Sequence, residues 1–277
     1  MQQRIKFSFY LVLLAAIILS CSAERNLARQ YVKGHKGEGI LLAPLNFLYK
    51  DNPGAYIDVS RYPGRAQQDS VAYFNSNYVQ YISDSILLTC FTNSMIDRFV
   101  ALGYEVTLEE SADVFLNSDN PKWIIQLSQL QLEENFTPRY IYGYDDEDEE
   151  YYQQYRQNSI TINSWLEVNH LNTENARKQL LYLSGYIEDF PDQNVSLSYY
   201  DGLFYFNDAR DTISMNDIYK MAVSSGKKHA ELLFDYFMND YIRTNLPKST
   251  ANRKEMHYNY KLNKIEAGLI ERFDVVK

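Results

Sequence analysis

The alternation of apolar and polar residues between positions 159 and 170 limits this chain more than any other local pattern. The two kinds of side chain alternate there in the order Ile160, Thr161, Ile162, Asn163, and again Leu166, Glu167, Val168, Asn169. A period of two residues buries one face of a strand and leaves the other in water, as is typical of an antiparallel sheet. A short polar turn at residues 171–175 and a returning segment at 178–188 complete a predicted hairpin.

Two long helices are predicted on either side of this hairpin. Apolar residues recur at steps of three and four between residues 77 and 102, and Gly103 follows where a left-handed cap ends a helix. A second such pattern covers residues 214–245, with Ser214 and Asp217 in the spacing of a capping box and Pro247 as its stop. Gly226 lies inside it and costs about 1 kcal/mol relative to alanine, so the helix could break there.

Two further apolar segments, residues 39–49 and 122–133, predict strands. In the second, the alternation slips at Ser128 and Gln129, which a β-bulge would explain. The predicted fold is α+β: a strand, a helix, a three-stranded antiparallel sheet and a helix. We expect one domain over residues 38–247, with the helices packed on one face of the sheet. The structure of the C-terminal tail, residues 248–277, is not decided by its sequence: a small hairpin, a helix and a frayed end are all open.

An acidic run at residues 145–150 interrupts the predicted sheet and is surrounded by tyrosines. Because like charges repel, we predict a long solvated loop over residues 136–158. A calcium site is the alternative, but the spaced carboxylates and the glycine of an EF-hand are missing. Tyrosine combines a flat apolar ring with a polar tip, so six side chains here are candidates for binding a partner: Tyr140, Tyr142, Tyr144, Tyr151, Tyr152 and Tyr155.

The N-terminal segment has the organisation of an export signal. Arg4 and Lys6 precede an apolar run that ends at Ile18-Leu19-Ser20-Cys21. This ending resembles the lipobox of bacterial lipoproteins, and the resemblance implies a signal peptide over residues 1–20 and lipidation of Cys21. The alternatives are an ordinary secreted signal and an uncleaved anchor, although the run is shorter than the about 20 residues that a membrane span needs.

Lipidation of Cys21 would fix the chain to a bilayer, since two acyl chains already anchor a protein stably. In the resemblance, Ser22 in place of aspartate favours the outer membrane, with the body on its periplasmic face or exposed at the cell surface. Glycines and basic residues in the segment that follows argue against a packed element, so residues 21–37 are predicted to form a tether. The formal net charge of −9 disfavours nucleic-acid binding and predicts repulsion from anionic headgroups, so the lipid alone should make the membrane contact.

The sequence contains no motif that names a catalytic activity. Cys90 lies in a helical apolar pattern, so it is expected to be a buried, small hydrophobic side chain. The histidines lie far apart in the sequence, and each is expected to be structural or solvated: His35, His170, His229 and His257. We therefore predict no catalytic residue, no cofactor and no metal, while a pair of close carboxylates of the glycosidase type stays open.

The middle of the chain carries a second resemblance. A long helix ends at Leu102-Gly103-Tyr104, Ala112-Asp113-Val114 follows after a gap, and a strand begins at Trp123. This order is similar to the ABC-transport auxiliary lipoproteins and the amino-terminal domain of TolB, and the curli-secretion lipoproteins and the activators of peptidoglycan synthases use a related arrangement. The order of elements is similar over residues 39–244, whereas the residues themselves are similar only over 97–127. The resemblance implies a binding and assembly module without catalytic residues.

These features predict a non-catalytic envelope lipoprotein that helps to assemble, tether or transport another envelope component. Binding would use the exposed face of the sheet or the tyrosine-rich segment. The rival prediction is a carbohydrate-active or carbohydrate-binding surface lipoprotein, with aromatic rings that stack on sugar. A deep pocket with two close carboxylates would favour the rival, and a shallow surface without them would favour the accessory protein.

Overall fold

The computed structural model describes residues 23–55, 57–58, 60–171, 179–189, 195–209, 211–246, 255–268 and 274–276. The predicted signal peptide, residues 1–20, and Cys21 lie outside this part of the chain. An N-terminal helix occupies residues 23–34. It is followed by β1 (Gly39–Ala43), β2 (Tyr49–Asp51), α2 (Arg65–Phe74), η1 (Val79–Tyr81), α3 (Asp84–Leu102), β3 (Glu105–Leu108), η2 (Glu109–Ser111), α4 (Ala112–Leu116), β4 (Pro121–Tyr144), β5 (Glu150–His170), β6 (Gln179–Glu188), β7 (Val195–Tyr200), β8 (Leu203–Asp208), α5 (Met215–Asn245), β9 (Met256–Asn259), β10 (Lys264–Ala267) and β11 (Asp274–Val276).

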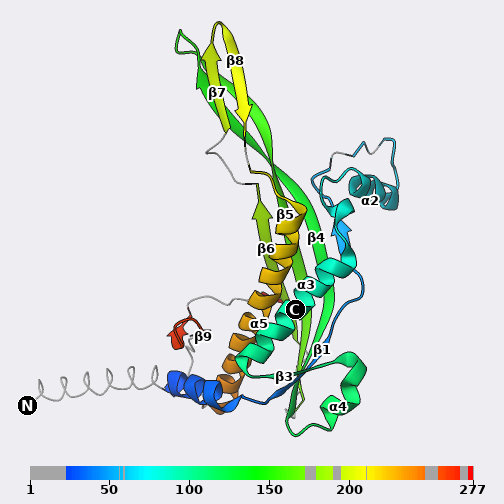
Figure 1. Ribbon diagram of the computed structural model, residues 1–277, viewed down its shortest axis with the longest axis vertical. Coiled ribbons are helices and arrows are strands. Elements are labelled where there is room, and N and C mark those ends of the chain that lie inside the picture. Colours follow the sequence, from blue (N-terminus) through cyan, green and yellow to red (C-terminus); the bar gives the residue numbers. More distant parts are fainter. Residues whose placement is uncertain are drawn as a thin grey trace, which may run out of the picture.

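The α+β class is as predicted, with one seven-stranded sheet at the centre (Figure 1). Its strands follow the order β11-β6-β5-β4-β1-β3, and β2 pairs with β4. β5 and β6 are antiparallel from Ser159 to Val168, which confirms the predicted hairpin. The pairing of β4 with β5 changes register between Leu127 and Gln129, so the predicted bulge is also present.

The predicted order of elements is incomplete, because the sheet is mixed. β1 runs parallel to both β3 and β4, and β2 also runs parallel to β4. Parallel neighbours need a long crossover, and here α2 and α3 carry the chain from β1 to β3. The single strand expected over residues 39–49 is two strands, β1 and β2, with the non-strand residues 44–48 between them.

α3 and α5 pack against each other and cover one face of the sheet (Figure 1). The capping box at the start of α5 is confirmed, since Ser214 and Asp217 each accept the other's backbone N–H. α5 continues unbroken through Gly226. A Cβ atom at this position would lie 2.2 Å from the carbonyl oxygen of Phe91, so glycine is what allows the two helices to approach so closely.

The end of α3 shows why the helix stops at Leu102-Gly103-Tyr104 and a strand follows. Gly103 has a φ of 102°, in the left-handed region that glycine tolerates. Its N–H donates to the carbonyl of Val100, and the N–H of Tyr104 donates to that of Phe99. These two bonds form a Schellman motif, and the Phe99 and Tyr104 rings pack edge to face beside it.

By length and composition alone, α3 could cross a membrane. Its apolar face instead lies in the core that it shares with α5 and the sheet, through Leu87, Phe91, Met95 and Phe99. It is therefore a core helix. It also begins later than the predicted residue 77, because residues 79–81 form the separate turn η1. Cys90, predicted to be buried, is only half-buried on this helix.

The predicted tether over residues 21–37 needs correction. Residues 23–34 form a helix, and Ala28 and Tyr31 are buried against the core. The Tyr31 hydroxyl lies 2.6 Å from that of Tyr104, which fixes this helix to the body of the protein. In the tail, β9 and β10 form the small hairpin that the sequence left open, and β11 adds an edge strand beside β6.

Candidate functional site

The two central strands extend beyond the body of the sheet as a projecting hairpin (Figure 1). β4 and β5 remain paired as far as Tyr144 and Glu150, so the turn contains only residues 145–149. The predicted solvated loop over residues 136–158 is therefore wrong. Tyrosine favours extended backbone, and the paired side chains stabilise a ladder that the acidic turn alone would not.

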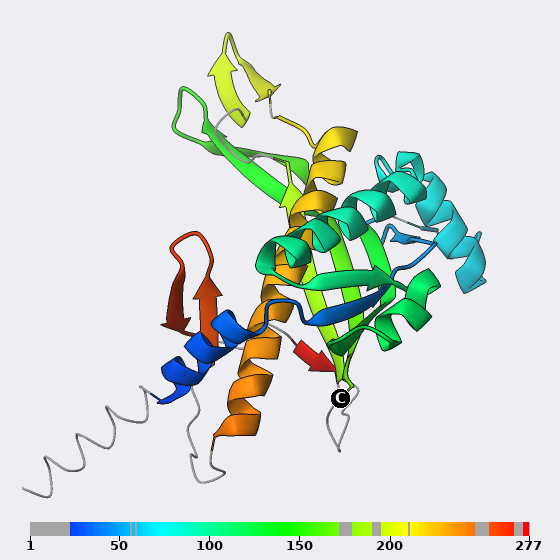
Figure 2. The same cartoon turned by 60° about the horizontal axis from the view of Figure 1, so that its bottom comes forward.

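A second hairpin, made of β7 and β8, packs along this extension (Figures 1 and 2). Its two-residue turn is Asp201-Gly202, with φ values of 50° and 77°. Two positive φ values are the mark of a type I′ hairpin turn. We call the two hairpins together, residues 136–158 and 195–208, the tyrosine arm.

Four of the six predicted tyrosines share the open face of the arm. Tyr142 is the cross-strand partner of Tyr152, and Tyr140 and Tyr144 lie two positions to either side of Tyr142 on the same strand. The ring of Tyr152 lies 5.7 Å from that of Tyr140 and 6.4 Å from that of Tyr142, measured between centroids. All four side chains are at least half exposed, and they line one exposed face of the hairpin.

The other two predicted tyrosines face inward, toward β7 and β8. The ring of Tyr151 lies 4.4 Å from that of Phe204, and the ring of Tyr155 lies 6.3 Å from that of Phe206. Gly143 allows the hairpins to approach, because a Cβ atom there would lie 3.0 Å from the Leu197 side chain. This face packs the two hairpins together: Tyr155 is buried there, whereas Tyr151 and Phe206 stay partly exposed.

The acidic tip is built around one carboxylate. Asp145 accepts the backbone N–H groups of Glu147 and Glu149, each at 2.9 Å, and so closes the turn. The hydroxyl of Tyr144 donates to Glu150, whose negative charge raises the pKa of Tyr144. Within the described ranges, no group of three or more side chains is placed to hold a metal ion. The tip therefore presents negative charge next to neutral tyrosine hydroxyls.

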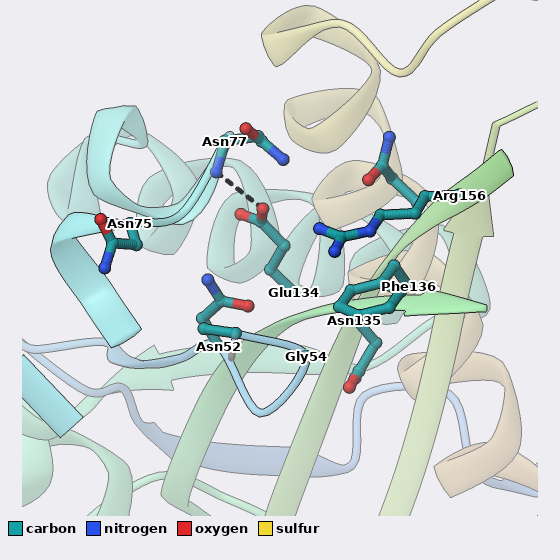
Figure 3. Close-up of a pocket in the computed structure, with 10 residues that line it drawn as sticks. Asn52, Gly54, Asn75, Asn77, Glu134, Asn135, Phe136 and Arg156 are labelled. Carbon is teal, nitrogen blue, oxygen red and sulfur yellow. Dashed lines mark hydrogen bonds between the residues drawn. The ribbon is translucent and has the colours of Figure 1, made fainter. Parts of the chain in front are cut away.

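A polar pocket of about 230 Å³ opens where the arm joins the body (Figure 3). Glu134 lies at its centre and is almost fully buried. Its carboxylate accepts the backbone N–H groups of Asn77, Tyr78 and Val79 at 2.7, 2.8 and 3.1 Å. The remaining lining is rich in amides and includes one aromatic ring: Asn52, Gly54, Ala55, Asn75, Asn77, Asn135, Phe136, Arg156 and Asn158.

This pocket lacks the features that would favour a carbohydrate-active protein. Glu134 is the single carboxylate among its described lining residues, and its oxygens are already taken by three backbone donors. The guanidinium of Arg156 lies 4.5 Å above the ring of Phe136, so one face of that ring is already covered. The pocket can accept a small polar group, but it holds no acid pair.

The histidines are dispersed, and each is packed against a different part of the body. His35 lies between the carbonyls of Tyr31 and Leu102, and the ring of Trp123 stacks between His170 and Phe237. His257 lies 2.5 Å from the Asp235 carboxylate, which attaches β9 to α5.

His229 contacts the hydroxyl of Ser164 deep in the core. Burial lowers the pKa of His229 to about 4, so this pair is neutral at physiological pH. Both residues are buried. The pair is therefore part of the packing between α5 and the sheet.

Comparison with known proteins places few limits on function. No protein-family model matches the chain, and no curated protein matches it. Among solved structures, it is similar to the crystal structure of a putative neuraminyllactose-binding hemagglutinin homolog from Helicobacter pylori. That likeness covers 76% of this chain and 95% of the other, with 9% sequence identity and a TM-score of 0.25. At this distance, function has to be inferred from the residues of the chain itself.

Proposed function

We propose that this chain is a non-catalytic envelope lipoprotein that captures another envelope protein with its tyrosine arm. Acyl chains on Cys21 would anchor it to the outer membrane, with its body on the periplasmic side. The capture would serve assembly, tethering or transport, as the resemblance of residues 97–127 to accessory lipoproteins implies. The observation that supports binding most directly is the open stripe formed by Tyr140, Tyr142, Tyr144 and Tyr152.

The stripe has the properties of a binding surface rather than of a packing surface. Tyrosine offers a large contact area with little conformational entropy to lose, and it is enriched at the centres of interfaces. The inner face of the arm is already filled by Phe204 and Phe206, so the arm does not need the outer tyrosines for its own packing. An exposed aromatic cluster of this kind is a marker of protein interaction.

The place of the arm supports the same proposal. It projects at one end of the long axis of the molecule, and the N-terminal helix lies at the other end (Figure 1). If Cys21 carries the lipid, the arm is held away from the bilayer and is free to reach a partner.

The chemistry of the arm defines the kind of partner that it would fit. The tyrosine rings suit an apolar or guanidinium-bearing surface, since arginine stacks on aromatic faces. The carboxylates of residues 145–150 lie beside them and would attract a cationic rim. We therefore expect the partner to present arginine or lysine residues around an apolar centre.

The triple substitution Tyr140→Ser, Tyr142→Ser and Tyr152→Ser is expected to abolish partner capture while the fold persists. If each tyrosine contributes about 1 kcal/mol, loss of the three removes about 3 kcal/mol and reduces affinity about 100-fold. The measurement is affinity capture of crosslinked partners from cell envelopes, followed by mass spectrometry.

The matched control changes three tyrosines that are similarly exposed but lie off the arm: Tyr49, Tyr81 and Tyr186. Their replacement by serine should leave capture unchanged. If the arm variant recovers the same proteins in the same amounts as the control variant, the arm is not the binding site. Circular dichroism of both variants checks that the fold is retained.

The anchor is tested separately. Cys21→Ala is expected to abolish the incorporation of labelled palmitate and to move the protein from the membrane fraction to the soluble fraction after lysis. Cys90→Ala is the matched control, because Cys90 is the other cysteine of the chain and lies on the core helix α3. A Cys21→Ala protein that still sediments with membranes would contradict the proposed anchor.

A further inference from the structure

The N-terminal helix (blue) and the β9–β10 hairpin (dark orange to red) lie side by side in Figure 2. Residues of these two segments and of the last turns of α3 line a large cationic pocket. Its volume is about 950 Å³. Its described lining contains no carboxylate, although the whole chain has a net charge of −9. We call this pocket the basic cleft, and it is lined by six cationic side chains: Arg25, Arg29, Lys33, Lys36, Arg98 and Lys264.

The cations on the N-terminal helix are not explained by folding. Arg25, Arg29 and Lys33 are spaced four residues apart, so they share one face of that helix. Like charges at this spacing repel and destabilise a helix. In the described part of the chain, neither these three nor Lys36 takes part in an ion pair. The described residues therefore supply no ion-pair partner for the positive charge on this helix.

Two arginines of the cleft also have buried donors without acceptors. The guanidinium of Arg98 stacks on the ring of Tyr260 at 3.6 Å, and its Nε lies 2.8 Å from a carboxylate oxygen of Glu231. Its buried Nη2 nevertheless has no hydrogen-bond partner among the described residues, and the same holds for the Nε of Arg25. Unsatisfied buried donors are costly, so the described residues leave both arginines with hydrogen-bonding capacity that they do not use.

The rest of the lining shows that the ligand is more than a simple anion. Val32, Leu102, Phe234 and Ile265 contribute apolar side chains to the same lining. Inorganic phosphate would use the cations and leave these apolar groups in contact with water. A ligand that joins a phosphate group to an apolar part matches both kinds of lining residue.

We propose that the basic cleft binds the phosphate-bearing headgroup of an anionic lipid. Guanidinium groups hold phosphate oxygens in pairs, and lysines add point charges around them. The N-terminal helix lies immediately after Cys21, so the anchor of the proposed function would bring the cleft to the surface of the bilayer. The net negative charge of the chain predicts repulsion from anionic headgroups. The positive charge of the cleft would outweigh this repulsion locally, because a ligand responds to the local field more than to the total charge.

The test is calorimetric titration of the full chain, held in a neutral detergent, with three probes. They are dihexanoyl-phosphatidylglycerol, dihexanoyl-phosphatidylcholine and inorganic phosphate. We expect saturable binding of the phosphatidylglycerol at one molecule per chain. Phosphatidylcholine and inorganic phosphate should each bind at least about tenfold more weakly, because each lacks one of the two properties that the cleft recognises.

The variant Arg25→Gln, Arg29→Gln, Lys33→Gln should lose about 100-fold in affinity for phosphatidylglycerol, since each cation near an anionic headgroup contributes about fivefold. The matched control removes three exposed cations elsewhere, Arg61, Arg65 and Lys220, with the same change in net charge. It should bind like the unmodified chain.

Three results would overturn the proposal. Equal affinity for both phospholipids would mean that the headgroup charge is not recognised. Phosphate binding as tight as that of phosphatidylglycerol would identify a soluble phosphate as the ligand instead of a lipid. An equal loss of phosphatidylglycerol affinity in the cleft variant and in the control would mean that only the net charge of the chain matters. None of these measurements involves the tyrosine arm or Cys21, so the proposed function stands or falls separately.

Discussion

Replacing Gly226 by alanine is expected to destabilise the protein by about 3 kcal/mol, although alanine is the better helix former. Helix propensity alone would favour the substitution by about 1 kcal/mol. The new Cβ atom, however, would lie 2.2 Å from the carbonyl oxygen of Phe91 and 2.3 Å from the hydroxyl of Ser94. Because the first of these atoms belongs to the backbone of α3, no change of rotamer relieves the clash, and the helices have to separate.

The measurement is the urea midpoint of unfolding, with Gly34→Ala as the matched control. Gly34 is the last residue of the N-terminal helix, and a Cβ atom there would have nothing within 4 Å. The control should be neutral or slightly stabilising. A Gly226→Ala protein as stable as the control would mean that α3 and α5 are not packed this closely.

Glu134→Ala is expected to cost about 3 to 5 kcal/mol of stability. The carboxylate crosses from β4 to the turn before α3, where it accepts three backbone N–H groups. Without it, the buried N–H groups of Tyr78 and Val79 lose the carboxylate that accepts them. Glu134→Gln should have a smaller effect of about 2 kcal/mol, because it keeps the shape and one of the two acceptor oxygens.

Glu133 provides the comparison for this prediction. It is adjacent in β4, points to the opposite face, and accepts a hydrogen bond from the side chain of Gln131. Glu133→Ala should change the free energy of unfolding by less than about 0.5 kcal/mol. If both alanine variants unfold at the same urea concentration, Glu134 does not hold η1 to the sheet.

Sequence patterns were sufficient where a local interaction determines the structure. The capping box at Ser214, the cap at Gly103 and the bulge at Ser128 each depend on a few neighbouring residues, and each was predicted from them. The hairpin of β5 and β6 belongs to the same group, since its alternation continues over many residues and its connection is short.

Long-range packing decided the elements that were missed. The parallel pairing of β1 with β3 and β4 depends on segments more than 60 residues apart, as in the pair Ile40 and Val106. The N-terminal helix was predicted as a tether because of its charges, but Ala28 and Tyr31 attach it to the core. The basic cleft joins segments from the two ends of the chain, so no single stretch of sequence indicates it.

The tyrosine arm lies between these cases. The sequence placed six tyrosines in one region, but it did not indicate their division between two faces. That division follows from parity once the hairpin is recognised, because Tyr151 and Tyr152 are adjacent and must point to opposite sides of a strand. The missed second hairpin also had a local signal, since Asp201-Gly202 between aromatic residues is a strong turn signature.

The continuity of β4 and β5 has a mechanical consequence. Both strands run from the turn at residues 145–149 into the centre of the sheet, without a linker between arm and body. A force applied at the tip along the strands is therefore resisted in shear by many hydrogen bonds at once. The arm would act as a stiff lever, so that traction exerted by whatever it holds reaches the body without being absorbed by a hinge.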